Sequence, residues 1–90
     1  MNRFEKELNK RLVGQRLTKY EIKKIINLIF DLDYTIMVDT TENNNKEMDY
    51  EYTINFDIGK SCYEVKISYL LTRDNRMYTT QISLNKTPKK

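Results

Sequence analysis

Histidine, alanine and tryptophan are absent from this sequence of 90 residues, which contains one cysteine, one proline and two glycines. Without histidine, the chain has neither an imidazole base nor a histidine ligand for a metal ion. The single cysteine, Cys62, excludes an internal disulfide and a cluster of zinc-binding thiolates, and no histidine is present to activate it as a nucleophile. We therefore expect no metal site and no thiol-based catalysis.

The scarcity of glycine excludes a glycine-rich phosphate loop. The segment Gly-Lys-Ser at 59–61 lacks the upstream glycine and the following helix that such a loop requires. Carboxylates remain as candidates for catalysis, and the pair Asp31 with Asp33, or Asp49 with Glu51, could in principle hold a hard cation. Paired carboxylates need a pocket before their pKa values diverge, and alternate residues of an exposed strand usually meet only water. We therefore expect a protein that is not an enzyme and binds no cofactor.

No long hydrophobic run is present, and the first twenty residues carry charges throughout. A membrane-spanning helix needs about 20 consecutive apolar residues, so no membrane partner is expected. Ninety residues suffice for one small domain with one core. Together with the lone cysteine, which fits a reducing compartment, these features predict a soluble cytoplasmic protein.

Two helices are predicted in the first third of the chain. Over residues 2–13, apolar side chains recur at four-residue intervals, at Phe4, Leu8 and Leu12. Gly14 follows as a residue that tolerates the left-handed conformation of a helix end.

The second helix has a recognisable start at Thr18, whose side chain can cap the first turn while Glu21 reaches back to it. One apolar face then follows, made of Ile22, Ile25, Ile26 and Ile29. This helix should end near residues 30–33.

After the helices, the hydrophobic period changes from about 3.6 to 2, as in strands. Four strands are predicted, and their inward residues are Leu32, Tyr34, Ile36 and Val38; Met48, Tyr50, Tyr52, Ile54, Phe56 and Ile58; Tyr63, Val65, Ile67, Tyr69 and Leu71; and Tyr78, Thr80, Ile82 and Leu84. Residues 40–47 contain no apolar side chain and are predicted to form a loop.

Turn residues support this pairing. Asp74-Asn75 suits a two-residue hairpin turn, because both residues tolerate positive φ. That turn predicts four inward pairs, Leu71 with Tyr78, Tyr69 with Thr80, Ile67 with Ile82 and Val65 with Leu84. Either Gly59-Lys60 or Lys60-Ser61 can join the second strand to the third.

The predicted fold is therefore α+β, with two N-terminal helices packed on one face of a four-stranded antiparallel β-meander. Residues 1–85 should form this single domain, and residues 86–90 a flexible basic tail in which Pro88 discourages pairing.

Charge is separated along the chain. Residues 1–30 hold eight basic and three acidic groups, residues 31–57 one basic and eight acidic groups, and residues 58–90 seven basic and two acidic groups. The net charge of +3 thus conceals a dipolar molecule. A solvated face that keeps the sheet soluble is one interpretation. The other is a surface that meets a positively charged groove of a partner protein.

The candidate residues of this acidic face are Asp39, Glu42, Glu47, Asp49, Glu51 and Asp57. An aromatic end is expected beside it, made of Met48, Tyr50, Tyr69, Leu71 and Tyr78. The aromatic end is either covered by the first helix or exposed as an apolar patch with hydroxyl groups, a composition favoured at interfaces. The same patch could join two copies in a homodimer.

A basic surface offers an alternative function, nucleic-acid binding through phosphate contacts. Its candidate residues are Arg16, Lys19, Lys23, Lys24, Lys89 and Lys90. Lysines on the outer side of a helix that buries isoleucines are also ordinary solvated residues.

In its size, its preference for residues with AT-rich codons and its acidic 31–57 block on a basic chain, the sequence resembles the phage-encoded inhibitors of bacterial defence, the anti-CRISPR class. The resemblance lies in these overall properties and not in a shared motif. It implies a non-enzymatic inhibitor in the cytoplasm of a bacterial host, which occupies either a nucleic-acid channel or a moving domain of a defence nuclease. The acidic residues would then stand in for phosphates.

Overall fold

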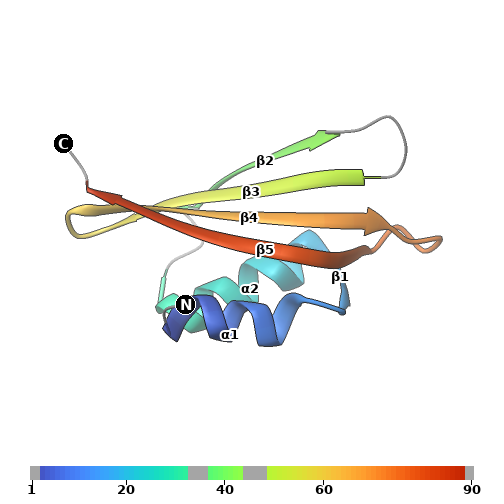
Figure 1. Ribbon diagram of the computed structural model, residues 1–90, viewed down its shortest axis with the longest axis horizontal. Helices are drawn as coiled ribbons and strands as arrows, with labels where there is room; N and C mark the ends of the chain where they lie inside the picture. The colour runs from blue at the N-terminus through green and yellow to red at the C-terminus, as the bar shows by residue number, and fades with distance from the viewer. Residues whose placement is uncertain (1–2, 33–36, 44–48, 89–90) are drawn as a thin grey trace.

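Two helices lie side by side against one face of a twisted antiparallel sheet in a computed structural model, which describes residues 3–32, 37–43 and 49–88 (Figure 1). The elements in chain order are α1 (Arg3–Leu12), β1 (Arg16–Leu17), α2 (Lys19–Phe30), β2 (Val38–Asn43), β3 (Asp49–Ile58), β4 (Ser61–Leu71) and β5 (Met77–Pro88). The strands are arranged in the order β1-β5-β4-β3-β2, and every neighbouring pair is antiparallel. The predicted α+β class is confirmed, with five strands instead of four.

Both helices begin and end close to the predicted positions. The Thr18 hydroxyl accepts a hydrogen bond from the Glu21 backbone N–H at 3.2 Å, and the Thr18 N–H donates to the Glu21 carboxylate at 3.0 Å. This capping box satisfies two N–H groups that the first helical turn leaves unpaired. At the other end, Asp31 adopts the left-handed conformation, with φ of 56°, and closes α2. Gly14 follows α1 with φ of +82°.

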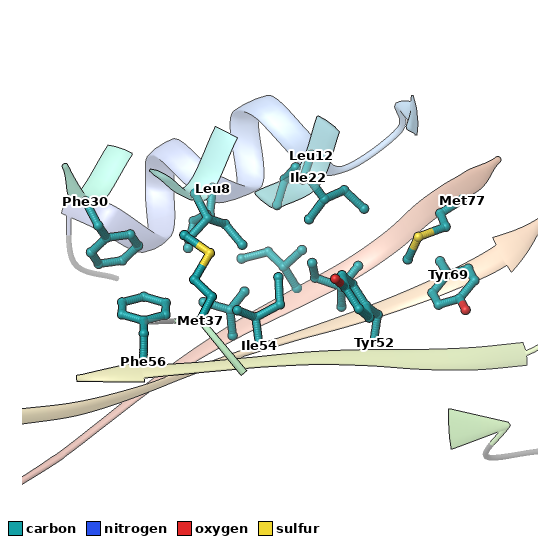
Figure 2. Close-up of a cluster of buried hydrophobic side chains, with 14 residues drawn as sticks. Leu8, Leu12, Ile22, Phe30, Met37, Tyr52, Ile54, Phe56, Tyr69 and Met77 are labelled. Atoms are coloured by element: carbon teal, nitrogen blue, oxygen red, sulfur yellow. The ribbon is translucent and has the colours of Figure 1, made fainter. Parts of the chain in front are cut away.

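The core fills the space between the helices and the sheet (Figure 2). Its helical members are Leu8, Leu12, Ile22, Ile26 and Phe30, and its strand members are Tyr52, Ile54, Phe56, Val65, Ile67, Tyr69, Met77 and Ile82. Phe30 joins the two layers, because its ring packs edge-on against Phe56 at 5.0 Å and stacks on Phe4 at 4.6 Å between centroids. The predicted apolar faces of both helices therefore point to the sheet, although Phe4 remains partly exposed.

The β3–β4 hairpin follows the first of the two predicted turns. Ile58 pairs with Ser61 across Gly59-Lys60, and Gly59 has φ of +59°. Positive φ at the first central residue is the pattern of the type II′ turn, whose twist matches that of the flanking strands. The alternation along β3 is also confirmed, since Tyr52, Ile54 and Phe56 are buried.

The predicted two-residue turn between β4 and β5 is wrong. Leu71 pairs with Met77, and the Thr72 N–H donates to the Arg76 carbonyl at 2.8 Å. The loop therefore spans three residues, 73–75, and ends with Asn75 in the left-handed conformation at φ of 62°. This is a common three-residue hairpin geometry, and asparagine is one of the few residues that tolerate its last position.

A bulge in β5 restores the predicted register farther along the hairpin. Ser68 pairs with Gln81 and Tyr69 with Thr79, so Thr80 is the extra residue. Beyond it, the predicted pairs Ile67 with Ile82 and Val65 with Leu84 are confirmed, whereas the pairs Leu71 with Tyr78 and Tyr69 with Thr80 are wrong. An extra residue reverses the facing of the chain, and this places Met77 and Thr79 inside instead of Tyr78 and Thr80.

The first strand of the predicted meander is wrong in its facing and its extent. Met37 is buried, whereas Val38, predicted to point inward, is 64% exposed. β2 then continues through Thr40 and Thr41 to Asn43, within the predicted loop. Tyr34 and Ile36 lie outside the described residues.

The fifth strand and the end of β5 were not predicted. Arg16 pairs with Tyr78 and Leu17 with Met77, which makes β1 too short to show a hydrophobic period. β5 extends to Pro88, opposite Ser61. Over residues 79–88 no described strand lies on the other side of β5, so Pro88 occupies an edge, where its missing N–H is tolerated.

Candidate functional site

The two helices and the sheet face turned away from them differ in charge. The described basic side chains of the helices are Arg3, Lys6, Lys10, Arg11, Lys19, Lys23 and Lys24, and the acidic ones before the helix cap at Asp31 are Glu5, Glu7 and Glu21. The sheet face turned away from the helices instead carries Glu51, Asp57 and Glu64, with Lys66 and Arg16, the partner of Tyr78, as its basic residues. The basic residues of the helices and the acidic residues on the outer side of β3 therefore lie on opposite sides of the sheet, whereas the described basic residues of the 58–90 block belong to the sheet layer itself.

We call the sheet surface opposite the helices the outer sheet face, defined by Glu51, Thr53, Asn55, Asp57, Glu64, Lys66, Leu70 and Tyr78. Its residues alternate with buried ones such as Tyr52 and Ile54 along β3. Glu64 lies 3.8 Å from the Lys66 ammonium and accepts a hydrogen bond from Asn85 at 3.3 Å. Glu51 and Asp57 belong to the predicted acidic face and lie where that prediction places them.

The outer sheet face also contains an exposed apolar pair. Leu70 and Tyr78 are cross-strand partners, 44% and 39% exposed, near the 73–75 loop. Leu70 was missed in the sequence because it precedes Leu71, and only one of two adjacent apolar residues can point inward on a strand. The three-residue turn decides which one does.

The predicted aromatic end is therefore divided between the two sides of the sheet. Tyr50 and Tyr69 stack with centroids 5.4 Å apart on the core side, where Leu71 also packs. Tyr69 is buried, and burial raises the pKa of its hydroxyl above the ordinary value. Tyr78 instead lies on the outer sheet face. Met48 lies outside the described residues.

Asp39 occupies the core side of β2 and not the acidic outer face. The Tyr52 hydroxyl donates to its carboxylate at 2.7 Å, and the Lys23 ammonium lies 3.2 Å from it. The hydrogen bond from Tyr52, followed by the interactions with Lys23, holds the pKa of Asp39 below its ordinary value. Burial, followed by the same hydrogen bond, raises the pKa of Tyr52. Both pKa shifts favour a protonated Tyr52, which donates, and a charged Asp39, which accepts. The hydrogen bond and the ion pair with Lys23 thus link β2 to β3 and α2.

Replacing Asp39 with asparagine is expected to destabilise the fold by about 1–3 kcal/mol at neutral pH, the range for a hydrogen bond to a charged group. Because the folded pKa is lowered, this contribution is present above the unfolded value of about 3.9. It is lost as the pH falls through the folded pKa, so the difference between wild type and Asp39→Asn should shrink in acid. Urea unfolding from pH 7 to pH 2.5 measures it.

The matched control is Glu51→Gln on the outer sheet face, a half-buried residue outside the core, which should change stability by less than about 0.5 kcal/mol, as surface substitutions away from buried networks do. A constant difference between wild type and Asp39→Asn at all pH values would contradict the role assigned to the Asp39 charge.

Of the three remaining acidic candidates, two belong to described strands and one does not. Glu42 and Asp49 belong to β2 and β3 and are opposite Glu51 and Leu70, respectively. Glu47 lies outside the described residues.

The basic candidates do not form one surface. Arg16 belongs to β1 and pairs with Tyr78, Lys23 is engaged by Asp39, and the Lys19 ammonium lies 5.3 Å from the centre of the Tyr52 ring. Lys24 is exposed on α2. Lys89 and Lys90 lie outside the described residues.

Within the described ranges, no group of three or more acidic or cysteine side chains is arranged to hold a metal ion. No helix there has the length and apolar character needed to cross a membrane. No protein-family model matches the chain, and no curated protein or solved structure matches it either. The surface geometry is therefore the basis for a functional proposal.

Proposed function

We propose that the protein is a non-catalytic binding protein whose outer sheet face docks on a positively charged surface of a partner protein. The observation that carries the proposal is that one face combines Glu51 and Asp57 with the exposed Leu70–Tyr78 pair, while the basic helices cover the opposite face. Charge in this arrangement favours one orientation of approach, and the apolar pair can be desolvated on contact.

The shape of the outer sheet face favours a macromolecule over a small molecule. Two hollows that described residues line on this face have volumes of about 190 Å³, beside Glu51 and Lys66, and about 150 Å³, beside Asn55 and Glu64. Sites for small molecules are usually about 300–1,000 Å³ and mostly apolar. A broad, shallow and polar surface with one apolar pair instead matches the composition of protein interfaces, which combine aromatic anchors with a polar rim.

The partner that fits this surface has a groove lined by lysine and arginine. The resemblance to phage-encoded inhibitors of bacterial defence supports a defence nuclease as that partner, in the cytoplasm of a bacterial host. In such a complex, the carboxylates of β3 would take positions that nucleic-acid phosphates otherwise occupy, and Tyr78 with Leu70 would fill a neighbouring apolar depression.

Affinity capture from the native host or from phage-infected cells tests this proposal. Three baits are compared by quantitative mass spectrometry: wild type, Glu51→Lys/Asp57→Lys, and the control Glu7→Lys/Asp31→Lys, which makes the same charge change on the helix side. We expect wild type and the control to enrich the same protein and the outer-face variant to lose it by tenfold or more, about 1.4 kcal/mol. Capture of that protein by all three baits to the same extent would refute the acidic-face mechanism.

Two alternative functions predict different results in experiments on the purified protein. A nucleic-acid-binding protein would shift bare DNA or RNA in a salt-dependent manner, and Lys19→Glu and Lys24→Glu would weaken the shift. A homodimer would sediment as two chains, and Tyr78→Ala would return it to one. Either result without an outer-face partner protein would replace the proposal.

A further inference from the structure

The helix side of the molecule contains a groove that lies away from the outer sheet face. It lies between α1 and α2, has a volume of about 410 Å³, and is lined by Arg3, Phe4, Glu7, Arg11, Leu28 and Ile29. Leu28, in the last turn of α2, is 65% exposed, although large aliphatic side chains are usually buried. The core does not use this side chain.

The two walls of the groove differ in chemistry. The α2 wall is apolar, made of Leu28 and Ile29, and the Phe4 ring adds to it while resting on Phe30. The α1 wall is charged: Arg11 Nε lies 3.1 Å from the Glu7 carboxylate, one turn away, so Glu7 is neutralised locally. Among the described residues, Arg3 makes no ion pair. The groove therefore presents an apolar strip beside an unmatched positive charge.

We propose that this groove binds an acidic amphipathic helix of a partner protein. A helix laid between two helices buries an apolar stripe at positions i, i+4 and i+7, which the strip of Phe4, Leu28 and Ile29 can receive. Acidic residues beside that stripe would face Arg3, and the excess of basic over acidic residues on α1 and α2 attracts such a segment. α1 is ten residues long, or about 15 Å, which accommodates about three turns of a docked helix.

Other ligand classes fit this groove less well. Nucleic-acid binding would require several cations converging on phosphates, whereas the groove combines Arg3 and the paired Arg11 with an apolar wall of Leu28, Ile29 and Phe4. A membrane surface would be met by apolar residues on a convex face, whereas Phe4 and Ile29 line a hollow beside Leu28. The concave shape and the two-sided chemistry favour a single amphipathic helix.

Fluorescence anisotropy with a designed probe tests the inference. The probe is a fluorescein-labelled peptide of about 16 residues, with leucine at i, i+3, i+4 and i+7 and glutamate at most other positions, which gives one apolar helical stripe. A peptide of the same composition with leucine at every second position lacks that stripe and is the control ligand. We expect the full-length protein to bind the probe at micromolar concentrations and the control ligand at least tenfold more weakly.

Three variants locate the binding site. Leu28→Ala should weaken binding about fivefold and Arg3→Glu about tenfold, since each tenfold corresponds to about 1.4 kcal/mol. Gln81→Ala, an exposed and uncharged substitution on β5, should change it less than about twofold. Glu51→Lys/Asp57→Lys should leave probe binding intact, so failure of this inference and failure of the outer-face proposal can be distinguished.

Equal binding of the two peptides, no effect of Leu28→Ala, or no binding below about 1 mM would overturn the inference. Binding to vesicles of anionic phospholipid that is sensitive to Leu28→Ala, without binding to the probe, would overturn it in favour of a membrane surface. Thermal unfolding of each variant confirms that the substitutions leave the fold intact, as expected for residues on the surface.

Discussion

Truncating Tyr52 to alanine should lower the free energy of unfolding by about 3–5 kcal/mol, the range for removing a buried aromatic side chain. Tyr52 is completely buried in β3, opposite Ile67, and its ring lies in the middle of the core seen in Figure 2. The substitution leaves a cavity between the helices and the sheet, and it removes the hydroxyl that donates a hydrogen bond to Asp39. Small domains are stable by about 5–15 kcal/mol, so the variant should be close to unfolding at 37 °C. Urea unfolding followed by circular dichroism measures the change.

The matched control is Tyr52→Phe, which retains the ring and removes only the hydroxyl. Its expected cost is about 1–3 kcal/mol, the same range as for Asp39→Asn, because both substitutions remove the one hydrogen bond to a charged acceptor. If Tyr52→Ala cost no more than Tyr52→Phe, the ring would not be part of the core, and the packing of the helices on β3 would be wrong.

Replacing Tyr78 or Leu70 with alanine should weaken binding of the captured partner by about 2 kcal/mol or more, which is about thirtyfold, as for interface hot spots. Both side chains are exposed, adjacent across β4 and β5, and surrounded by polar residues that can exclude water at the rim of an interface. Their truncation should change folding stability much less than binding, because neither belongs to the core. Isothermal titration calorimetry with the purified partner gives the affinity, and urea unfolding gives the stability.

The control for Tyr78 is Tyr20→Ala, because Tyr20 is also an exposed tyrosine, 65% accessible, but lies on the helix layer. It should leave the affinity unchanged within about twofold, as substitutions outside an interface do. A larger loss for Tyr20→Ala than for Tyr78→Ala would place the interface on the helix side of the molecule.

Local signals in the sequence predicted much of the fold. The Thr18–Glu21 capping box predicted the start of α2, because its two hydrogen bonds depend on residues only three positions apart. The strict alternation of β3 predicted its facing, because this strand lies between β4 and β2 and buries Tyr52, Ile54 and Phe56 on one side. The Gly59-Lys60 turn was one of two options that kept this alternation, and both gave the same inward face for β3.

Features that depend on distant residues were not predicted. The three-residue turn before β5 and the bulge at Thr80 offset one another, so Ile67 and Ile82 pair in either version, and only Tyr78 and its neighbours reveal the difference. The facing of Met37 and Val38 was ambiguous, because both are apolar and adjacent. It is settled by Asp39, whose carboxylate reaches Tyr52, thirteen residues later, and Lys23 on α2.

Two acidic residues of the candidate surface were predicted correctly, and its exposed leucine was not. Glu51 and Asp57 lie on the outer sheet face because β3 has the expected alternation, whereas Asp39 belongs to a different side because β2 has the opposite one. Leu70 became part of the surface through a one-residue difference in a turn. The groove between the helices could not be anticipated, since it depends on how Phe4 and Leu28 pack across two elements.

Chemical footprinting of the captured complex tests most directly whether the outer sheet face is the binding surface. Carboxylates are coupled to an amine with a water-soluble carbodiimide, and lysines are acylated, in the free protein and in the complex, and the modified sites are read by mass spectrometry. If the outer sheet face is the binding surface, Glu51 and Asp57 lose most of their reactivity on binding, while Lys6 and Lys10 on α1 react as before. Protection of the α1 lysines with unchanged labelling of Glu51 and Asp57 would contradict it.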